Sequence, residues 1–264
     1  MSPAALLLGL FFAVPLAALV VDAFSEGGAG FARAVALPTF WPSLLGSVAL
    51  TFVAATFSAV VGLLVAMYLA CLPEHRRTAL SFIIALPLTF SGLIVAYGFI
   101  LSYGRAGFVT QLLGYAGLDP ATVGGLLFTA VGLAFASSYY LIPRVVMMLL
   151  PVLVNFDRAQ LDIAESLGAT PNQAVRHVLL PQIGGALIGA YCLIAAVVFG
   201  AYGTALALVG TQLRILPLQL YSLISESGSD FPAAAALSIL ITAACSGVMA
   251  IGEWTSHRHE RHLR

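Results

Sequence analysis

The sequence predicts an all-α membrane protein that consists of a bundle of six transmembrane helices. Hydrophobic residues make up 61% of its 264 residues and charged residues only 8%, whereas a soluble domain carries about 25% charged residues. The mean hydropathy is +1.02. Several apolar runs reach the roughly 20 residues that a helix needs to cross the hydrocarbon core, and they lack the strict alternation of a β-barrel strand. We therefore expect residues 1–264 to form one transmembrane domain, without a separate soluble catalytic domain.

The six predicted spans follow one another along the chain. They cover about Ala4–Phe24, Leu44–Leu72, Leu80–Tyr103, Val123–Leu153, Gly184–Val209 and Phe231–Trp254. We expect the first to be a retained span, because no basic segment precedes it. Pro73–Arg77 predicts a tight charged turn, and Pro87 predicts a kink in the third span beside Gly92. The stretch at 108–117 predicts a short interfacial helix.

The distribution of arginine predicts the orientation of these spans. One set of connections, with the carboxy-terminal tail, holds seven arginines: Arg76, Arg77, Arg158, Arg176, Arg258, Arg261 and Arg264. The opposite set holds three: Arg33, Arg105 and Arg214. Because cytoplasmic loops carry the excess of basic residues, the seven-arginine side and both termini are predicted to be cytoplasmic.

Composition and motifs exclude several classes of activity. All eleven basic residues are arginine, so neither a P-loop nor a Schiff-base lysine is present. No HExxH or CxxC motif occurs, and the three cysteines are predicted to be buried free thiols. The net charge of zero predicts no nucleic-acid partner. The tail histidines His257, His259 and His262 have a spacing that could bind metal, but a solvated chain end is the favoured interpretation. We expect no enzyme activity and no cofactor bound by this chain.

One long polar interval, Asp157–Pro181, interrupts the apolar sequence. Asp157 is predicted to cap a helix, with Gln160 completing a capping box, and Gly168 to end that helix in a left-handed conformation. Thr170, with Pro171 and Gln173 after it, predicts a second helix start. This second helix is expected to run towards Leu180 and to stop before Pro181.

The same interval resembles the EAA loop of the permease subunits of ATP-binding-cassette (ABC) importers. Asp162, Ile163 and Ala164 occupy the Glu-Ala-Ala positions of the family pattern, and Gly168 and Leu180-Pro181 fall in register. Asp in place of Glu and Ile in place of the first Ala are departures from the pattern, so the match rests equally on the glycine and the Leu-Pro pair. An ordinary helix–turn–helix connector between two spans is the alternative. We call residues 155–183 the EAA-like loop.

The resemblance implies the fold of a type I (MetI-like) importer permease and a set of partners. These are a dimer of cytoplasmic ATPases that bind ATP and Mg²⁺, a second permease that is expected to be a homologous chain, an extracytoplasmic substrate-binding protein and the lipid of a bacterial inner membrane. It also implies that the EAA-like loop contacts the ATPase. Asp162 and Glu165 would face positive groups, Ile163, Ala164 and Leu167 would enter a groove, and Gly168 would permit the turn. Ala169, Leu180 and Pro181 complete the predicted contact set.

A few polar residues inside the spans are candidates for the translocation pathway or its gate. Arg144 lies deep in the fourth span, where a charge must face protein or water; a structural arginine that snorkels or pairs with a carbonyl is the equal alternative. The other candidates are Ser91, Tyr97, Tyr103, Tyr202 and Thr204, of which at least half are expected to be packing residues.

Two runs suggest the substrate class by resemblance. Phe199–Val209 and Arg214–Ile224 resemble the polyamine permeases and their relatives that carry ferric iron, thiamine, phosphonate or sulfate. The resemblance implies a small polar solute such as a polyamine, with those other solutes as alternatives. A secondary transporter driven by an ion gradient would need acids or histidines inside the spans, and an intramembrane enzyme would need a core His or Asp; the predicted spans offer almost none.

Overall fold

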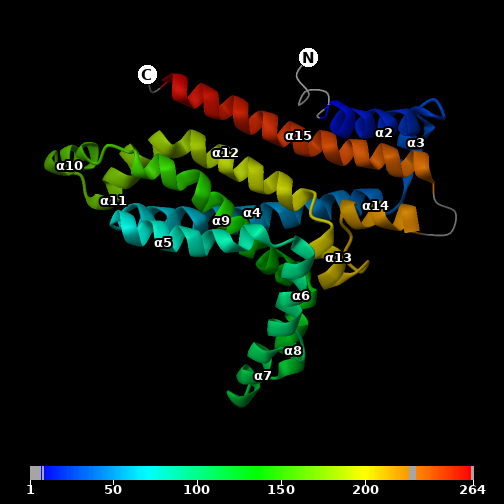
Figure 1. The fold of residues 1–264 in the computed structure, drawn as a ribbon, viewed down its shortest axis with the longest axis horizontal. Helices are drawn as coiled ribbons and strands as arrows, with labels where there is room; N and C mark the ends of the chain where they lie inside the picture. The colour runs from blue at the N-terminus through cyan, green and yellow to red at the C-terminus, as the bar shows by residue number, and fades with distance from the viewer. Residues whose placement is uncertain (1–6, 8, 226–229, 263–264) are drawn as a thin grey trace.

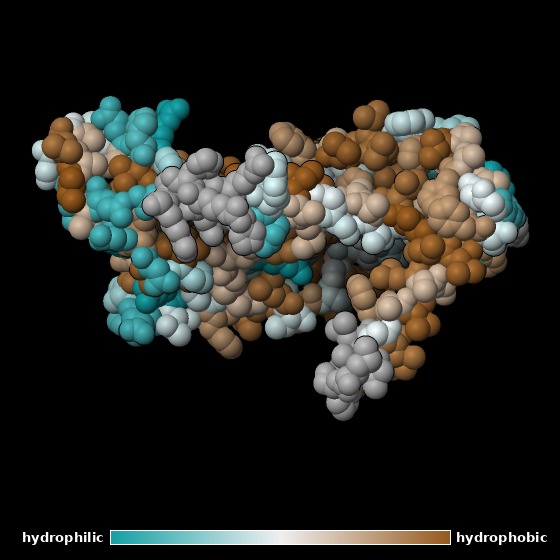
Figure 2. All heavy atoms as spheres, turned by 90° about the horizontal axis from the view of Figure 1, so that it is seen from above, coloured by the Kyte–Doolittle hydropathy of each residue, from teal (hydrophilic) through white to brown (hydrophobic). Residues whose placement is uncertain are grey.

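The computed structural model describes residues 7, 9–225 and 230–262, and all regular structure within these ranges is helical. Five helices of the described residues are long and apolar enough to cross a membrane, or six if the bent pair at the amino-terminal end counts as one span. In Figure 2 hydrophobic residues cover most of the molecule, and hydrophilic residues gather mainly at the end formed by α10 and α11. The predicted helical membrane fold is confirmed.

Four long helices form the body of the bundle. They are α4 (Phe40–Ala70), α9 (Ala130–Val154), α12 (Leu180–Phe199) and α15 (Phe231–His262). Helix α4 packs along α9, and α12 lies against both α4 and α15 (Figure 1). Gly62 allows α4 to approach α9 closely, because a Cβ atom there would lie 2.7 Å from the Val145 side chain. Close approach through small residues is the usual packing of helices in lipid, where no hydrophobic force drives association.

The third predicted span is broken into two helices that point in different directions. Helix α5 (Glu74–Ala85) is followed by a 3₁₀ turn, Leu86–Thr89, and then by α6 (Gly92–Tyr103). The break at Pro87 confirms the predicted kink. The predicted tight turn at Pro73–Arg77 is wrong, because Pro73 is the extended residue before α5 and Glu74 begins that helix. An acidic residue in the first turn stabilises a helix start.

Helices α6, α7 (Phe108–Tyr115) and α8 (Pro120–Gly125) form an arm that projects from the side of the long bundle (Figure 1). The short helix predicted at 108–117 is confirmed as α7. The fourth span begins at Ala130 and not at Val123, because Thr129 adopts an extended conformation and caps α9 by accepting a hydrogen bond from the Gly132 amide. Helix α8 has its own cap in Asp119, whose carboxylate accepts from the amides of Ala121 and Thr122.

The fifth predicted span also ends early. Helix α12 stops at Phe199, and Gly200–Tyr202 separates it from the short helix α13 (Gly203–Val209). Helix α14 (Leu216–Ser225) then packs against α4 and α15. The amide of Leu216 donates to Ser47 Oγ of α4 at 2.8 Å, which fixes the start of α14 on that helix.

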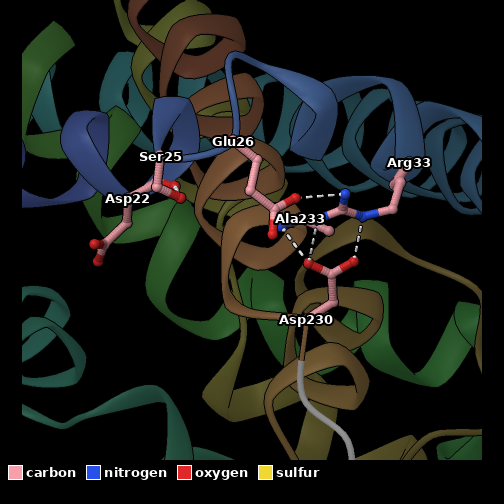
Figure 3. Close-up of polar contacts among 6 residues, drawn as sticks. All are labelled: Asp22, Ser25, Glu26, Arg33, Asp230 and Ala233. Carbon is pink, nitrogen blue, oxygen red and sulfur yellow. Dashed lines mark hydrogen bonds and ion pairs between the residues drawn. The ribbon is translucent and has the colours of Figure 1, made fainter.

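The first span is bent. A π-helical turn, Gly9–Ala13, leads into α2 (Val14–Phe24), and α3 (Ala29–Ala36) follows at an angle of 80°. Part of the predicted start of this span, residues 4–6 and 8, lies outside the described residues. Arg33 of α3 binds Glu26 at 2.6 Å and forms a two-pronged ion pair with Asp230, just before α15, at 2.6 and 2.9 Å (Figure 3). This cluster holds α3 on the first turn of α15.

Candidate functional site

The EAA-like loop folds as two short helices at one end of the bundle (Figure 1). Helix α10 (Ala159–Ser166) is followed by Leu167 and then by Gly168, whose φ of +93° is the predicted left-handed conformation. The amide of Gly168 donates to the Glu165 carbonyl at 2.9 Å and that of Ala169 to the Ala164 carbonyl at 3.1 Å. These two bonds form a Schellman motif, and they turn the chain sharply after α10.

Helix α11 (Pro171–Ala174) starts as predicted. Thr170 Oγ1 accepts from the Gln173 amide at 3.4 Å, and the Gln173 side chain accepts from the Thr170 amide at 2.8 Å, which completes the capping box. The predicted end before Pro181 is wrong. A π-helical turn, Val175–Leu179, carries the chain directly into α12, and Pro181 lies in the first turn of α12. Proline is tolerated in a first turn, so here it does not end the helix.

Two side-chain contacts fix the EAA-like loop to the spans beside it. Arg158 Nη2 donates to the carbonyl oxygen of Ala70, at the end of α4, at 2.6 Å. Gln182 Nε2 of α12 donates to Gln160 Oε1 of α10. The predicted cap at Asp157 is wrong, because Arg158 is the residue that precedes α10. Asp157 Oδ1 still accepts from the Ala159 amide at 3.1 Å. The expected capping-box role of Gln160 is also wrong, because its side chain is bound by Gln182 of α12. The sequence did not indicate Arg158 or Gln182 as anchors.

The tip of the EAA-like loop exposes apolar side chains. Ile163 is 60% exposed and Leu167 is 85% exposed. Ala164 and Ala169 are half-buried, and the carboxylates of Asp162 and Glu165 are exposed beside them. Exposed leucines and isoleucines are common on the lipid-facing spans. In the EAA-like loop, however, charged and amide side chains surround them, which matches the apolar core and polar rim of a protein interface. Leu180 is half-buried and Pro181 is exposed, on the side of the loop that enters the bundle.

A pocket of about 340 Å³ lies where α6, α9 and α13 meet. It brings together three of the predicted pathway residues: Arg144 from α9, Ser91 from the cap of α6 and Thr204 from α13. A Cβ atom added at Gly92 would collide with Thr204 Oγ1, so a larger residue does not fit there unless Thr204 moves. Tyr140, one turn before Arg144, also lines the pocket, and its ring centroid is 5.7 Å from the Arg144 guanidinium carbon. Sequence reasoning missed Tyr140, although its i, i+4 spacing to Arg144 could have indicated it.

The three remaining predicted pathway residues lie elsewhere. Tyr97 is 56% exposed on the arm helix α6. Tyr103 packs against Phe99 and Phe135, with ring centroids 5.5 and 5.9 Å apart. Tyr202 lies beside Tyr221 of α14 at 5.6 Å. Within the described residues no cluster of three or more His, Cys, Asp or Glu could hold a metal, and the tail side chains of His257, His259 and His262 lie outside the part that is described.

Known proteins of similar sequence are permeases. No family model matches the chain. It is 29% identical over 249 residues to the chloroplastic sulfate permease 2 of Chlamydomonas reinhardtii, covering 93% of this chain and 65% of that protein. It is also 29% identical over 238 residues to the sulfate transport system permease protein CysT of Salmonella typhimurium, covering 89% and 83%. The spermidine/putrescine transport system permease protein PotB of Escherichia coli is 25% identical over 228 residues, covering 84% and 79%.

Solved structures share the fold. A chain of the bacterial alginate ABC transporter, crystallised with a periplasmic protein that holds an alginate pentasaccharide, superposes with a TM-score of 0.78 at 18% identity. The match covers 97% of this chain and 92% of the other. In sequence the chain is similar to permease proteins of transport systems, and it shares the fold of a chain of the alginate ABC transporter. It spans slightly less than two thirds of the chloroplastic relative and most of the bacterial ones.

The EAA-like loop and the pocket at Arg144 differ in their exposure and surroundings. The EAA-like loop is an exposed projection tied to α4 and α12 by hydrogen bonds. The pocket at Arg144 is an open cavity lined by residues of α6, α9, α12 and α13. The loop has the properties of a binding surface for another protein, and the pocket those of a site for a small molecule.

Proposed function

We propose that this chain is the permease subunit of a binding-protein-dependent ABC importer. It forms half of the translocation pathway across a bacterial inner membrane, and its EAA-like loop and both termini face the cytoplasm. A second permease, expected to be a homologous chain, supplies the other half, and an extracytoplasmic binding protein delivers the substrate. ATP and Mg²⁺ bind to a dimer of separate cytoplasmic ATPases. The substrate is a small polar solute; the relatives named above are permeases for sulfate and for the polyamines spermidine and putrescine.

The observation that carries this proposal is a pair of exposed apolar side chains, one on α10 and one directly after it. Leu167 and Ile163 lie at the tip of a projection whose two ends continue into α9 and α12. A helix that presents such residues can lie in a groove of a partner. Because the loop is anchored to α4 by Arg158, a partner that moves α10 also moves the bundle.

The proposal is tested by co-purification of the ATPase through a tag on this chain. Leu167→Asp places a charge where the partner groove would be apolar, and we expect recovery of the ATPase to fall at least about tenfold, the equivalent of about 1.4 kcal/mol. Asn172→Asp is the matched control, because it adds the same charge at an exposed site of the same loop. Equal ATPase recovery with wild type and Leu167→Asp, at equal abundance in the membrane, would contradict the proposal.

A further inference from the structure

The pocket between α6, α9 and α13 contains one arginine and no acidic side chain. Its lining residues include neither Asp nor Glu. The Arg144 guanidinium lies over the Tyr140 ring, and within the described residues no carboxylate forms an ion pair with it. A guanidinium stacked on a ring uses its face for that contact. Its N–H edge therefore remains available to a ligand.

The position of Arg144 makes this arrangement unusual. It lies ten residues before Val154, the last residue of a 25-residue helix that is long and apolar enough to span the membrane. At about 1.5 Å per residue the charge is about 15 Å from the end of the span. A charge at such depth is costly, and it marks a functional site when it faces a cavity.

A second cationic pocket, of about 430 Å³, lies at the other end of α13. Arg105 lines it together with Phe128 and Gln212, and again no acidic residue contributes. The Arg105 guanidinium carbon is 6.0 Å from the centroid of the Phe128 ring. Helix α13 connects the two pockets, because its first residues line one and its last residues the other. Its seven residues correspond to about 10 Å.

Two other arginines of the chain bind acceptors of the protein itself. Arg33 forms ion pairs with Asp230 and Glu26, and Arg158 donates to the Ala70 carbonyl. The fold thus supplies acceptors where an arginine joins two helices. Arg105 and Arg144 have aromatic rings as their recorded partners, and both face pockets.

We propose that the two pockets form a route for a small tetrahedral oxyanion of the sulfate or phosphonate type, with Arg105 and Arg144 as successive binding groups. This rests on the proposed permease function and specifies its substrate class. The arginine fork matches two oxygens of such an anion. The Ser91 hydroxyl accepts from the Ile94 amide and keeps its own proton for donation to an anion. A polyamine would require carboxylates, and neither pocket lining contains one.

The first experiment measures the rate at which phenylglyoxal modifies each arginine. The transporter is purified in maltoside micelles through a tag on this chain, and modified peptides are quantified by mass spectrometry. Sulfate and methylphosphonate, at ten times their dissociation constants, are expected to slow modification of Arg144 and Arg105 by about tenfold. Chloride at equal ionic strength and spermidine are expected to have no effect. Arg76, which is exposed at the opposite end of α5 from the pocket, is the internal control and should react at an unchanged rate.

Three results would overturn the assignment. They are modification of Arg144 at the same rate with and without oxyanion, equal slowing at Arg76, and slowing by spermidine. A further measurement, in nanodiscs of phosphatidylglycerol, distinguishes a transported solute from lipid. Slower modification of Arg144 in nanodiscs than in micelles, without added anion, would assign the site to a lipid phosphate and not to a transported solute. The labelling reports on this chain directly. If oxyanions do not protect Arg144 although the ATPase still co-purifies, the oxyanion route is refuted and the proposed permease function is not affected.

A second experiment uses variants and equilibrium binding of radiolabelled sulfate. Arg144→Gln is expected to weaken binding by about ten- to hundredfold, the effect of losing charge-assisted hydrogen bonds. Arg144→Lys keeps the charge without the fork and should recover part of the affinity. Arg76→Gln is the matched control. Unchanged affinity in Arg144→Gln would refute the proposal; if that variant does not fold, the labelling of the wild-type chain decides.

Discussion

Gly168 provides the sharpest test of how the EAA-like loop works. Its φ of +93° is a conformation that side chains with a Cβ disfavour, whereas no atom lies within 4 Å of an added Cβ. A substitution therefore acts through the backbone and not through a clash. Holding a leucine in the left-handed conformation costs about 1–2 kcal/mol, which lowers the population of the observed turn about 5- to 30-fold. Abandoning the turn instead sacrifices the two bonds that close it, at about 0.5–1.5 kcal/mol each.

We therefore expect Gly168→Leu to insert into the membrane normally but to uncouple ATP hydrolysis from uptake. Gly168→Asn is the matched variant, because Asn visits the left-handed region far more readily, and it should retain most of the coupling. The assay compares substrate uptake with ATP hydrolysis in the transporter reconstituted into vesicles, at equal amounts of each variant. Wild-type uptake by Gly168→Leu, or equal defects in the two variants, would refute the role of the turn.

Three further predictions follow from individual contacts. Arg33 lowers the pKa of the Asp230 carboxyl below its ordinary value, chiefly through its hydrogen bonds. The stability that this ion pair contributes is therefore fully present above about pH 3.9, the ordinary pKa of an aspartate. It is lost as the pH falls through the lowered pKa of Asp230. Asp230→Asn should remove this acid-dependent loss in a thermal melt. Thr170→Ala removes the cap of α11 and should cost about 1 kcal/mol locally, seen as faster hydrogen exchange of the Gln173 amide. Gly62→Leu overfills the contact between α4 and α9 and should destabilise the bundle by about 1–3 kcal/mol, seen as a lower melting temperature.

Local sequence rules predicted those parts of the structure that short-range interactions decide. The left-handed glycine at 168 and the capping box of Thr170 with Gln173 involve residues within a few positions of each other. Hydrophobic length likewise predicted the spans, because each must be long enough for the membrane. These features depend on the chain segment itself, so a single sequence contains the necessary information.

Features that depend on distant partners were not predictable in the same way. Gln160 was expected to complete a capping box with Asp157, but its side chain binds Gln182 of α12, 22 residues away. The breaks at Thr129 and at Gly200 interrupt apolar runs that hydropathy alone treats as continuous. The grouping of Arg144, Ser91 and Thr204 depends on how three helices pack, while Tyr97 and Tyr103, which have similar sequence surroundings, face elsewhere.

The connection between the EAA-like loop and the Arg144 pocket follows from chain topology. Helix α9 leads into the loop and carries Arg144, and α12 leads out of the loop and carries Val197, which lines the same pocket. The loop is held to these spans at Gln182 and to α4 at Ala70. A displacement of α10 is therefore applied at once to two of the helices that line the pocket. We expect variants that loosen this attachment, such as Arg158→Gln, to weaken the dependence of uptake on ATP while leaving oxyanion protection of Arg144 unchanged. Loss of that protection in Arg158→Gln would show that the attachment shapes the pocket itself.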